Sequence, residues 1–144
     1  MPIPSIAILA AIAILSGSYN FFIKAGSDGI NQILGAVILQ VVAASIGCLM
    51  LLVLSMRGTT FQVTTKGCGY AILAGVAIGI AEILSFYLFS RGMSASLGIP
   101  LIVGGTAACG ALLGVLFLGE TLSFAQFTGV VIIVFGSALL LSAK

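Results

Sequence analysis

One acidic residue lies deep inside a long apolar run, where a carboxyl group can exchange protons or bind cations. Residues 67–90 contain a single charged side chain, Glu82. At about 1.5 Å of rise per helical residue, Glu82 would lie roughly 13 Å from one end of this run and 24 Å from the other. Ionisable groups are costly at that depth, and those that occur there commonly serve proton relays or substrate sites. Glu82 is therefore the first candidate for a functional group.

The residues around Glu82 predict which way it points. Gly75 and Gly79 precede it, and Phe86 and Phe89 follow it, at spacings that place all five on one helical stripe. Small residues let helices approach closely in lipid, so this stripe should face other helices or a cavity. Two interpretations remain open: a group that binds protons or substrate, or a neutral, hydrogen-bonded acid that fixes helix register.

A second polar stripe lies near the start of the chain. Ser16, Asn20 and Lys24 repeat every four residues, beside Tyr19, and could line a water-filled path. Lys24 could instead be a snorkelling anchor, and Asn20 could simply bond to a neighbouring helix. Gln40 and Tyr87 add hydrogen-bonding groups. We predict two sets of site residues: Glu82, Asn20, Tyr87 and Gln40 to bind solute or protons, and Ser16, Lys24, Tyr19 and Pro100 to line or gate the path.

Catalysis and nucleic-acid binding have little support. The sequence has no histidine and no C-x-x-C motif, and it has one buried acid where intramembrane hydrolysis usually needs a pair or a dyad. Its net charge of +2 is small and scattered. We expect no enzyme activity, no metal, no cofactor and no nucleic-acid partner.

The elements that would position these residues are membrane-spanning helices. Apolar residues make up 61% of the chain and charged residues 6%, against roughly a half and a quarter in soluble domains. Continuous apolar runs of about 20 residues favour helices over a barrel. The first run lacks the basic start and cleavage site of a signal peptide. We predict an all-α membrane protein, one domain over 1–144, with a bundle of five transmembrane helices at about 3–24, 30–56, 67–90, 94–118 and 123–142.

The fourth apolar run allows an alternative count. If residues 92–119 formed a re-entrant element around Pro100, the chain would have four spans. The length of the run favours a full crossing, and we expect Pro100 to bend the helix because proline removes a backbone donor.

The flanking charges predict orientation. Five spans place the two termini on opposite faces, with Arg57 and Lys66 on one face and Lys24, Arg91 and Lys144 on the other. Two against three is a weak positive-inside bias, so the chain is expected to insert both ways.

Glycines at helical spacing predict close packing. Gly75 with Gly79 and Gly110 with Gly114 each form a G-x-x-x-G pair, and Gly129 and Gly136 lie one heptad apart. We expect these six glycines at helix contacts or at a dimer interface, although packing within one chain would explain any single pair.

The C-terminal part resembles a known family. Pro100-Leu101-Ile102, the segment from Leu116-Phe117-Leu118-Gly119-Glu120 to Thr121-Leu122-Ser123, and Gln126-Phe127-Thr128-Gly129 are together similar to the EamA domain of the drug/metabolite transporter superfamily. The segment from Ser16 to Lys24 is similar to the end of that family's first helix, without its tryptophan. The resemblance is strong from Arg91 onward and looser before it.

The resemblance implies a stand-alone five-helix transporter unit. Such a unit would have to dimerise, most simply as an antiparallel homodimer that recreates an inverted repeat. It would carry small organic solutes, cationic or zwitterionic because of Glu82, across a cell membrane such as a prokaryotic inner membrane. The alternatives are a non-transporting membrane subunit that docks on a larger complex and one half of a heteromeric transporter.

Overall fold

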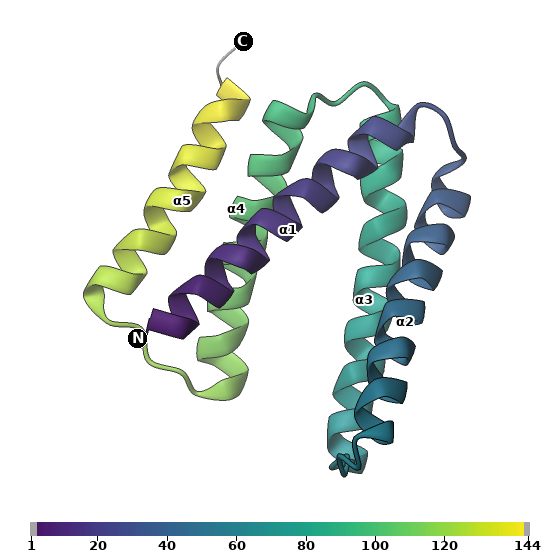
Figure 1. Cartoon of the computed structure of the whole chain (residues 1–144). Helices are drawn as coiled ribbons and strands as arrows, with labels where there is room; N and C mark the ends of the chain where they lie inside the picture. Colours follow the sequence, from purple (N-terminus) through teal and green to yellow (C-terminus); the bar gives the residue numbers. More distant parts are fainter. Residues whose placement is uncertain (1–2, 143–144) are drawn as a thin grey trace. The chain divides into compact units, whose positions relative to one another are not determined.

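The computed structural model describes residues 3–142, and this part of the chain is helical apart from its turns (Figure 1). Five helices are each long and apolar enough to cross a membrane. The predicted all-α fold with five spans is therefore confirmed. Lys144, one of the charges used to predict orientation, lies outside the described residues. The helices are α1 (Ile3–Ser27), α2 (Gln32–Met56), α3 (Thr65–Ser90), α4 (Ala95–Leu118) and α5 (Phe124–Ser142).

The observed helix bounds differ from the predicted ones by up to three residues, and local hydrogen bonds explain two of the differences. The first helix continues past Lys24 to Ser27, whose hydroxyl donates to the Lys24 carbonyl at 2.8 Å. The second helix begins at Gln32 because Asn31 caps it. The Asn31 side-chain oxygen accepts from the backbone N–H groups of Ile33 and Leu34.

The other turns carry similar start and stop chemistry. Thr64 caps α3 through the backbone N–H of Gly67. A capping box starts α5, because the Ser123 N–H donates to Gln126 Oε1 at 2.8 Å and the Gln126 N–H donates to Ser123 Oγ at 3.3 Å. Left-handed glycines follow three helices, where a side chain would be strained: Gly58, Gly92 and Gly119.

The chain divides into two compact units, and α1 contributes to both. One unit comprises residues 22–92, which contain the end of α1 together with α2 and α3. The other comprises the part of α1 up to Phe21 and everything described from Met93 onward, including α4 and α5. Each unit is described below by itself.

In the 22–92 unit, α2 and α3 lie side by side as an antiparallel pair (Figure 1). The Phe86 ring packs directly on Gly35, where an added Cβ would lie 2.8 Å from a ring carbon. Further along the pair, the Gln40 side-chain amide lies over Gly79. A Cβ added at Gly79 would lie 3.6 Å from Gln40 Oε1. Ala36 and Phe89 are fully buried on the same helices. Small residues on each helix thus admit large side chains from the other.

The part of this helix pair nearest the α2–α3 turn, residues 41–78, has no buried residue. Every residue from position 41 to position 78 is exposed, including both helix ends at the α2–α3 turn. Most of the residues on these exposed helix faces are apolar. Lipid, or another chain, must cover these faces in a membrane.

In the other unit, α4 and α5 pack through a second small-residue contact. Gly104 is buried against Ser137, whose hydroxyl occupies the space that a Cβ at Gly104 would need. The same hydroxyl lies 2.8 Å from the Ile133 carbonyl and 3.3 Å from the Pro100 carbonyl, so it can donate to either. The α4 helix runs through Pro100 for 24 residues. The helix is thus continuous and long and apolar enough for a full crossing, as the five-span count requires, and a bend at Pro100 stays a prediction.

Four of the six glycines predicted to mediate packing meet nothing inside the structure. A Cβ added to any of them would have no atom within 4 Å, apart from its own helix and nearest neighbours: Gly75, Gly110, Gly129 and Gly136. Gly79 contacts Gln40, and Gly114 lies under the Glu120 carboxylate. Packing within the described chain thus uses Gly79 and Gly114, and a dimer role for the other four stays a prediction.

Replacing Gly35 with alanine should destabilise the protein, because the new methyl group would overlap the Phe86 ring. Overpacking of this kind costs about 1–3 kcal/mol, and the melting temperature in detergent should fall. Gly47→Ala on the same helix is the matched control, since a Cβ there meets nothing within 4 Å. Equal melting temperatures for the two variants would contradict the contact.

Candidate functional site

The candidate site centres on Glu82, which is 2% exposed in the interior of α3. Phe86 and Phe89, one and two turns further along, are also buried, so the predicted stripe does face the protein from Gly79 to Phe89. Gly75, at the far end of the stripe, is exposed. The burial of the carboxyl group removes it from both water and lipid.

The Glu82 carboxyl group is not fully satisfied. Its Oε2 atom is buried and has no hydrogen-bond partner among the described residues. A buried polar atom without a partner costs free energy, about 1–3 kcal/mol or more when charged. Such an atom is available to a proton or to a donor group on a bound solute.

The α2 helix supplies a second polar group one turn away. Glu82 lies between the two contacts that join α2 to α3, with Gln40 on Gly79 on one side and Phe86 on Gly35 on the other. The half-buried Gln40 side chain makes no hydrogen bond to the described part of the chain. An amide and a carboxyl group are thus both free to bind at neighbouring turns of one helix pair.

Lys24 is positioned by other groups and does not pair with Glu82. Its Nζ donates to the Phe89 carbonyl at 3.1 Å and lies 3.5 Å from Asp28 Oδ2. A cation at the last turn of α3 also complements the negative end of that helix. Lys24 therefore anchors the end of α1 to the end of α3, which fits the snorkelling interpretation better than a path-lining role.

Tyr87 does not join Glu82. Five residues at about 100° each place it some 140° around the helix from Glu82, and it is 43% exposed. The Arg91 guanidinium lies 4.9 Å from its ring centroid, a cation–π distance. Arg91 and Tyr87 thus form a contact at the end of α3, apart from the buried carboxyl group.

The remaining predicted path residues belong to the other unit. Asn20 is 8% exposed, and its Nδ2 donates to the Ser16 carbonyl at 2.8 Å, one turn back on the same helix. Tyr19 is half-buried beside it. The Asn20 amide is thus partly satisfied locally. Joint action of Ser16, Tyr19, Asn20 and Pro100 with Glu82 stays a prediction.

Two contact residues were missed in the sequence. Gly35 belongs to none of the glycine pairs at helical spacing, and no sequence pattern marks it as the partner of Phe86. Ser137 lies alone in an apolar run, where a hydroxyl commonly bonds to its own helix. Across the described residues, no group of three His, Cys, Asp or Glu side chains could hold a metal ion.

These features define a class of protein: a multi-pass helical membrane protein with one buried, incompletely satisfied carboxyl group. The chain is 31% identical over 130 residues to an uncharacterized protein, MJ1333.1, of Methanocaldococcus jannaschii, and the match covers 90% of each chain. It belongs to the same family as that protein. No family model and no solved structure match the chain.

Replacing Lys24 with methionine should loosen the junction between α1 and α3. The Phe89 carbonyl would lose its charged donor, and a hydrogen bond of this kind contributes about 1–3 kcal/mol, with the lower end expected because Lys24 is partly exposed. The melting temperature in detergent should fall. Lys66→Met is the control, because Lys66 contacts only the face of Tyr70; an equal loss in both variants would refute the anchor.

Proposed function

We propose that this protein is a secondary transporter of small organic solutes that works by alternating access as an antiparallel homodimer in a cell membrane, such as a prokaryotic inner membrane. We further propose that it is a stand-alone EamA-type member of the drug/metabolite transporter superfamily. The observation that carries the proposal is the buried Glu82 carboxyl group, whose Oε2 has no partner among the described residues.

The chemistry of the site supports a cationic or zwitterionic solute. An ammonium group can donate to the Glu82 oxygen and to Gln40 Oε1, and the neighbouring Phe86 and Phe89 rings add apolar surface. Neither Lys24 nor any other described cation forms an ion pair with Glu82. The carboxyl group can therefore exchange a solute cation for a proton, which is the basis of proton coupling.

The dimer follows from the odd number of spans. Alternating access commonly uses two inverted repeats around a site near the membrane midplane, and one five-helix chain supplies one repeat. The weak charge bias at the helix ends favours insertion in both orientations. The exposed far part of the α2–α3 pair, residues 41–78, provides apolar helix surface that a second copy can cover.

A second candidate is a non-transporting membrane subunit, or one half of a heteromeric transporter. Four glycines favour it, because an added Cβ at each would meet nothing within 4 Å, which leaves room for the close approach of an unlike chain: Gly75, Gly110, Gly129 and Gly136. This candidate requires a stable complex with a different protein. For a subunit without transport, Glu82 would be dispensable.

Replacing Glu82 with glutamine should abolish coupling between solute and protons. In proteoliposomes, we expect the wild type to release protons when an amine substrate is added and the variant to show no release. Loss of a charged hydrogen bond should also weaken solute binding about tenfold or more. Asp28→Asn is the matched control, because it makes the same chemical change at an exposed turn position.

Two outcomes would reject the transport proposal. One is unchanged transport by Glu82→Gln at every pH. The other is the absence of any response in the wild type across a panel of amines, amino acids and hydrophobic drugs. Co-purification of an unlike five-helix chain would instead favour the heteromeric candidate.

Mapping the C-terminus should find it on both sides of the membrane. A reporter fused after Lys144 would be accessible to an impermeant label from each side in comparable amounts, because the flanking charges only weakly favour one orientation. Adding two lysines to the α2–α3 turn should shift the population toward one side. A single orientation in the wild type would rule out the antiparallel homodimer.

A further inference from the structure

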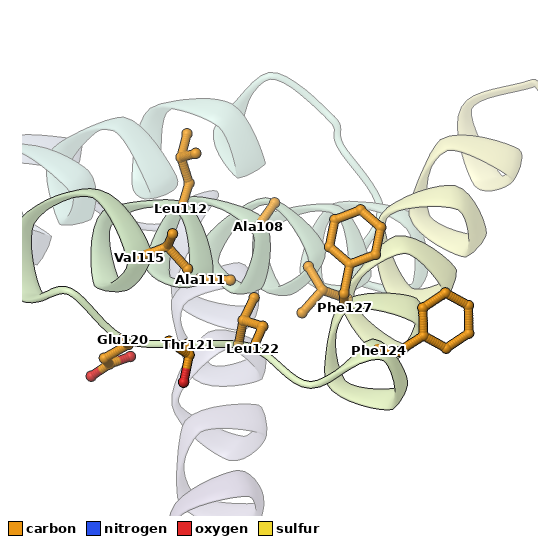
Figure 2. Close-up of a pocket in the computed structure, with 10 residues that line it drawn as sticks. Ala108, Ala111, Leu112, Val115, Glu120, Thr121, Leu122, Phe124 and Phe127 are labelled. Carbon is orange, nitrogen blue, oxygen red and sulfur yellow. The ribbon is translucent and has the colours of Figure 1, made fainter.

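An apolar groove lies along α4 and the start of α5, in the unit that does not contain Glu82. It has a volume of about 810 Å³, within the range of roughly 300–1,000 Å³ typical of small-ligand sites. Figure 2 shows Glu120 at one end of the row of lining side chains and the phenylalanines at the other. The apolar side chains that line the groove include Ala111, Leu112, Val115, Leu122 and Phe127.

The chain's own side chains leave this groove open. Leu112 is 58% exposed and Phe127 is 57% exposed, although both line it. The lining begins at Ala108 on α4 and reaches the turn that follows the helix. The eight helical residues from Ala108 to Val115 span about 10 Å, or a third of a hydrocarbon core of about 30 Å. In a bilayer, the group that fills such a groove is an acyl chain.

The single charged group of the groove lies in the turn between α4 and α5, at the level of lipid headgroups. Gly119 adopts a left-handed conformation with φ of 68°, and the Glu120 N–H then donates to the Gly114 carbonyl at 3.1 Å. The Glu120 carboxylate folds back over Gly114, where a Cβ would lie 2.6 Å from Oε2. Two glycines therefore fix the position of this carboxylate against the end of α4.

The Glu120 carboxylate has no counter-ion among the described residues. The ion pair that they form joins Lys24 to Asp28 and does not involve Glu120. It can therefore pair with a cation from outside the chain. A headgroup bearing an ammonium complements this charge, whereas a headgroup whose only charge is negative is repelled by it.

We propose that the α4–α5 groove is a binding site for one membrane lipid whose headgroup carries an ammonium group. The upper part of an acyl chain lies on the groove between Ala111 and Phe127, and the ammonium group pairs with Glu120. The site is independent of the proposed transport function, because it neither contains Glu82 nor requires solute movement.

Brominated lipids test the site, because bromine quenches tryptophan fluorescence on contact and the wild-type chain has no tryptophan. Leu112→Trp places a sole reporter in the groove. Ile14→Trp, at a 69% exposed position on α1, is the control reporter. The full chain is reconstituted in phosphatidylglycerol bilayers that contain either brominated phosphatidylethanolamine or brominated phosphatidylglycerol.

Quenching of the groove reporter should show an affinity about threefold higher for phosphatidylethanolamine than for phosphatidylglycerol, as expected for an exposed ion pair. The control reporter should show no preference.

Two variants in the Leu112→Trp background separate the charge from the groove. Glu120→Gln should remove the preference while quenching by both lipids persists. Gly114→Ala should do the same, because the new Cβ displaces the carboxylate, whereas Gly110→Ala has nothing within 4 Å and should retain it. Equal quenching of the Leu112→Trp reporter by both lipids, or a preference that survives Glu120→Gln, would overturn the proposal. So would the absence of quenching by either lipid, which would show that another chain covers the groove.

Discussion

Hydrocarbon offers no hydrogen bonds, and the rest of this structure depends on that constraint. Each backbone N–H and C=O within the bilayer must find a partner in the chain, so each apolar run becomes a helix and each irregular segment is confined to a short turn. The turns then carry the residues that end and start helices: Asn31, Thr64 and the Ser123–Gln126 capping box. Fold class, helix number and turn chemistry all follow from one property of the solvent.

The same constraint changes what holds the helices together. Lipid tails are as apolar as leucine, so burying leucine against another helix gains little, and close van der Waals contact takes over. Among the described residues, Phe86 is seated on Gly35, Gln40 lies over Gly79 and Ser137 is seated against Gly104. In each place a glycine supplies the space, and a side chain from the neighbouring helix fills it.

Charges show the constraint most directly. Lys24 reaches the carbonyl of Phe89 at the end of α3, and Arg91 lies over the ring of Tyr87, so both cations have partners near helix ends. Glu82 is the exception, because it is buried within a helix and its Oε2 is left without a partner among the described residues. A buried carboxyl oxygen without a partner makes Glu82 the natural centre of a functional proposal.

The sequence alone determined the five helices, their approximate ends and the burial of Glu82, because hydropathy, caps and helical spacing are local properties. It could not determine which glycines make contacts. Gly75 and Gly110 have the same spacing motif as Gly79 and Gly114, yet only the latter two meet a side chain. Nor could it assign Lys24 to the Phe89 carbonyl. Those outcomes depend on which faces of two helices meet and in what register, and only the tertiary structure fixes that register.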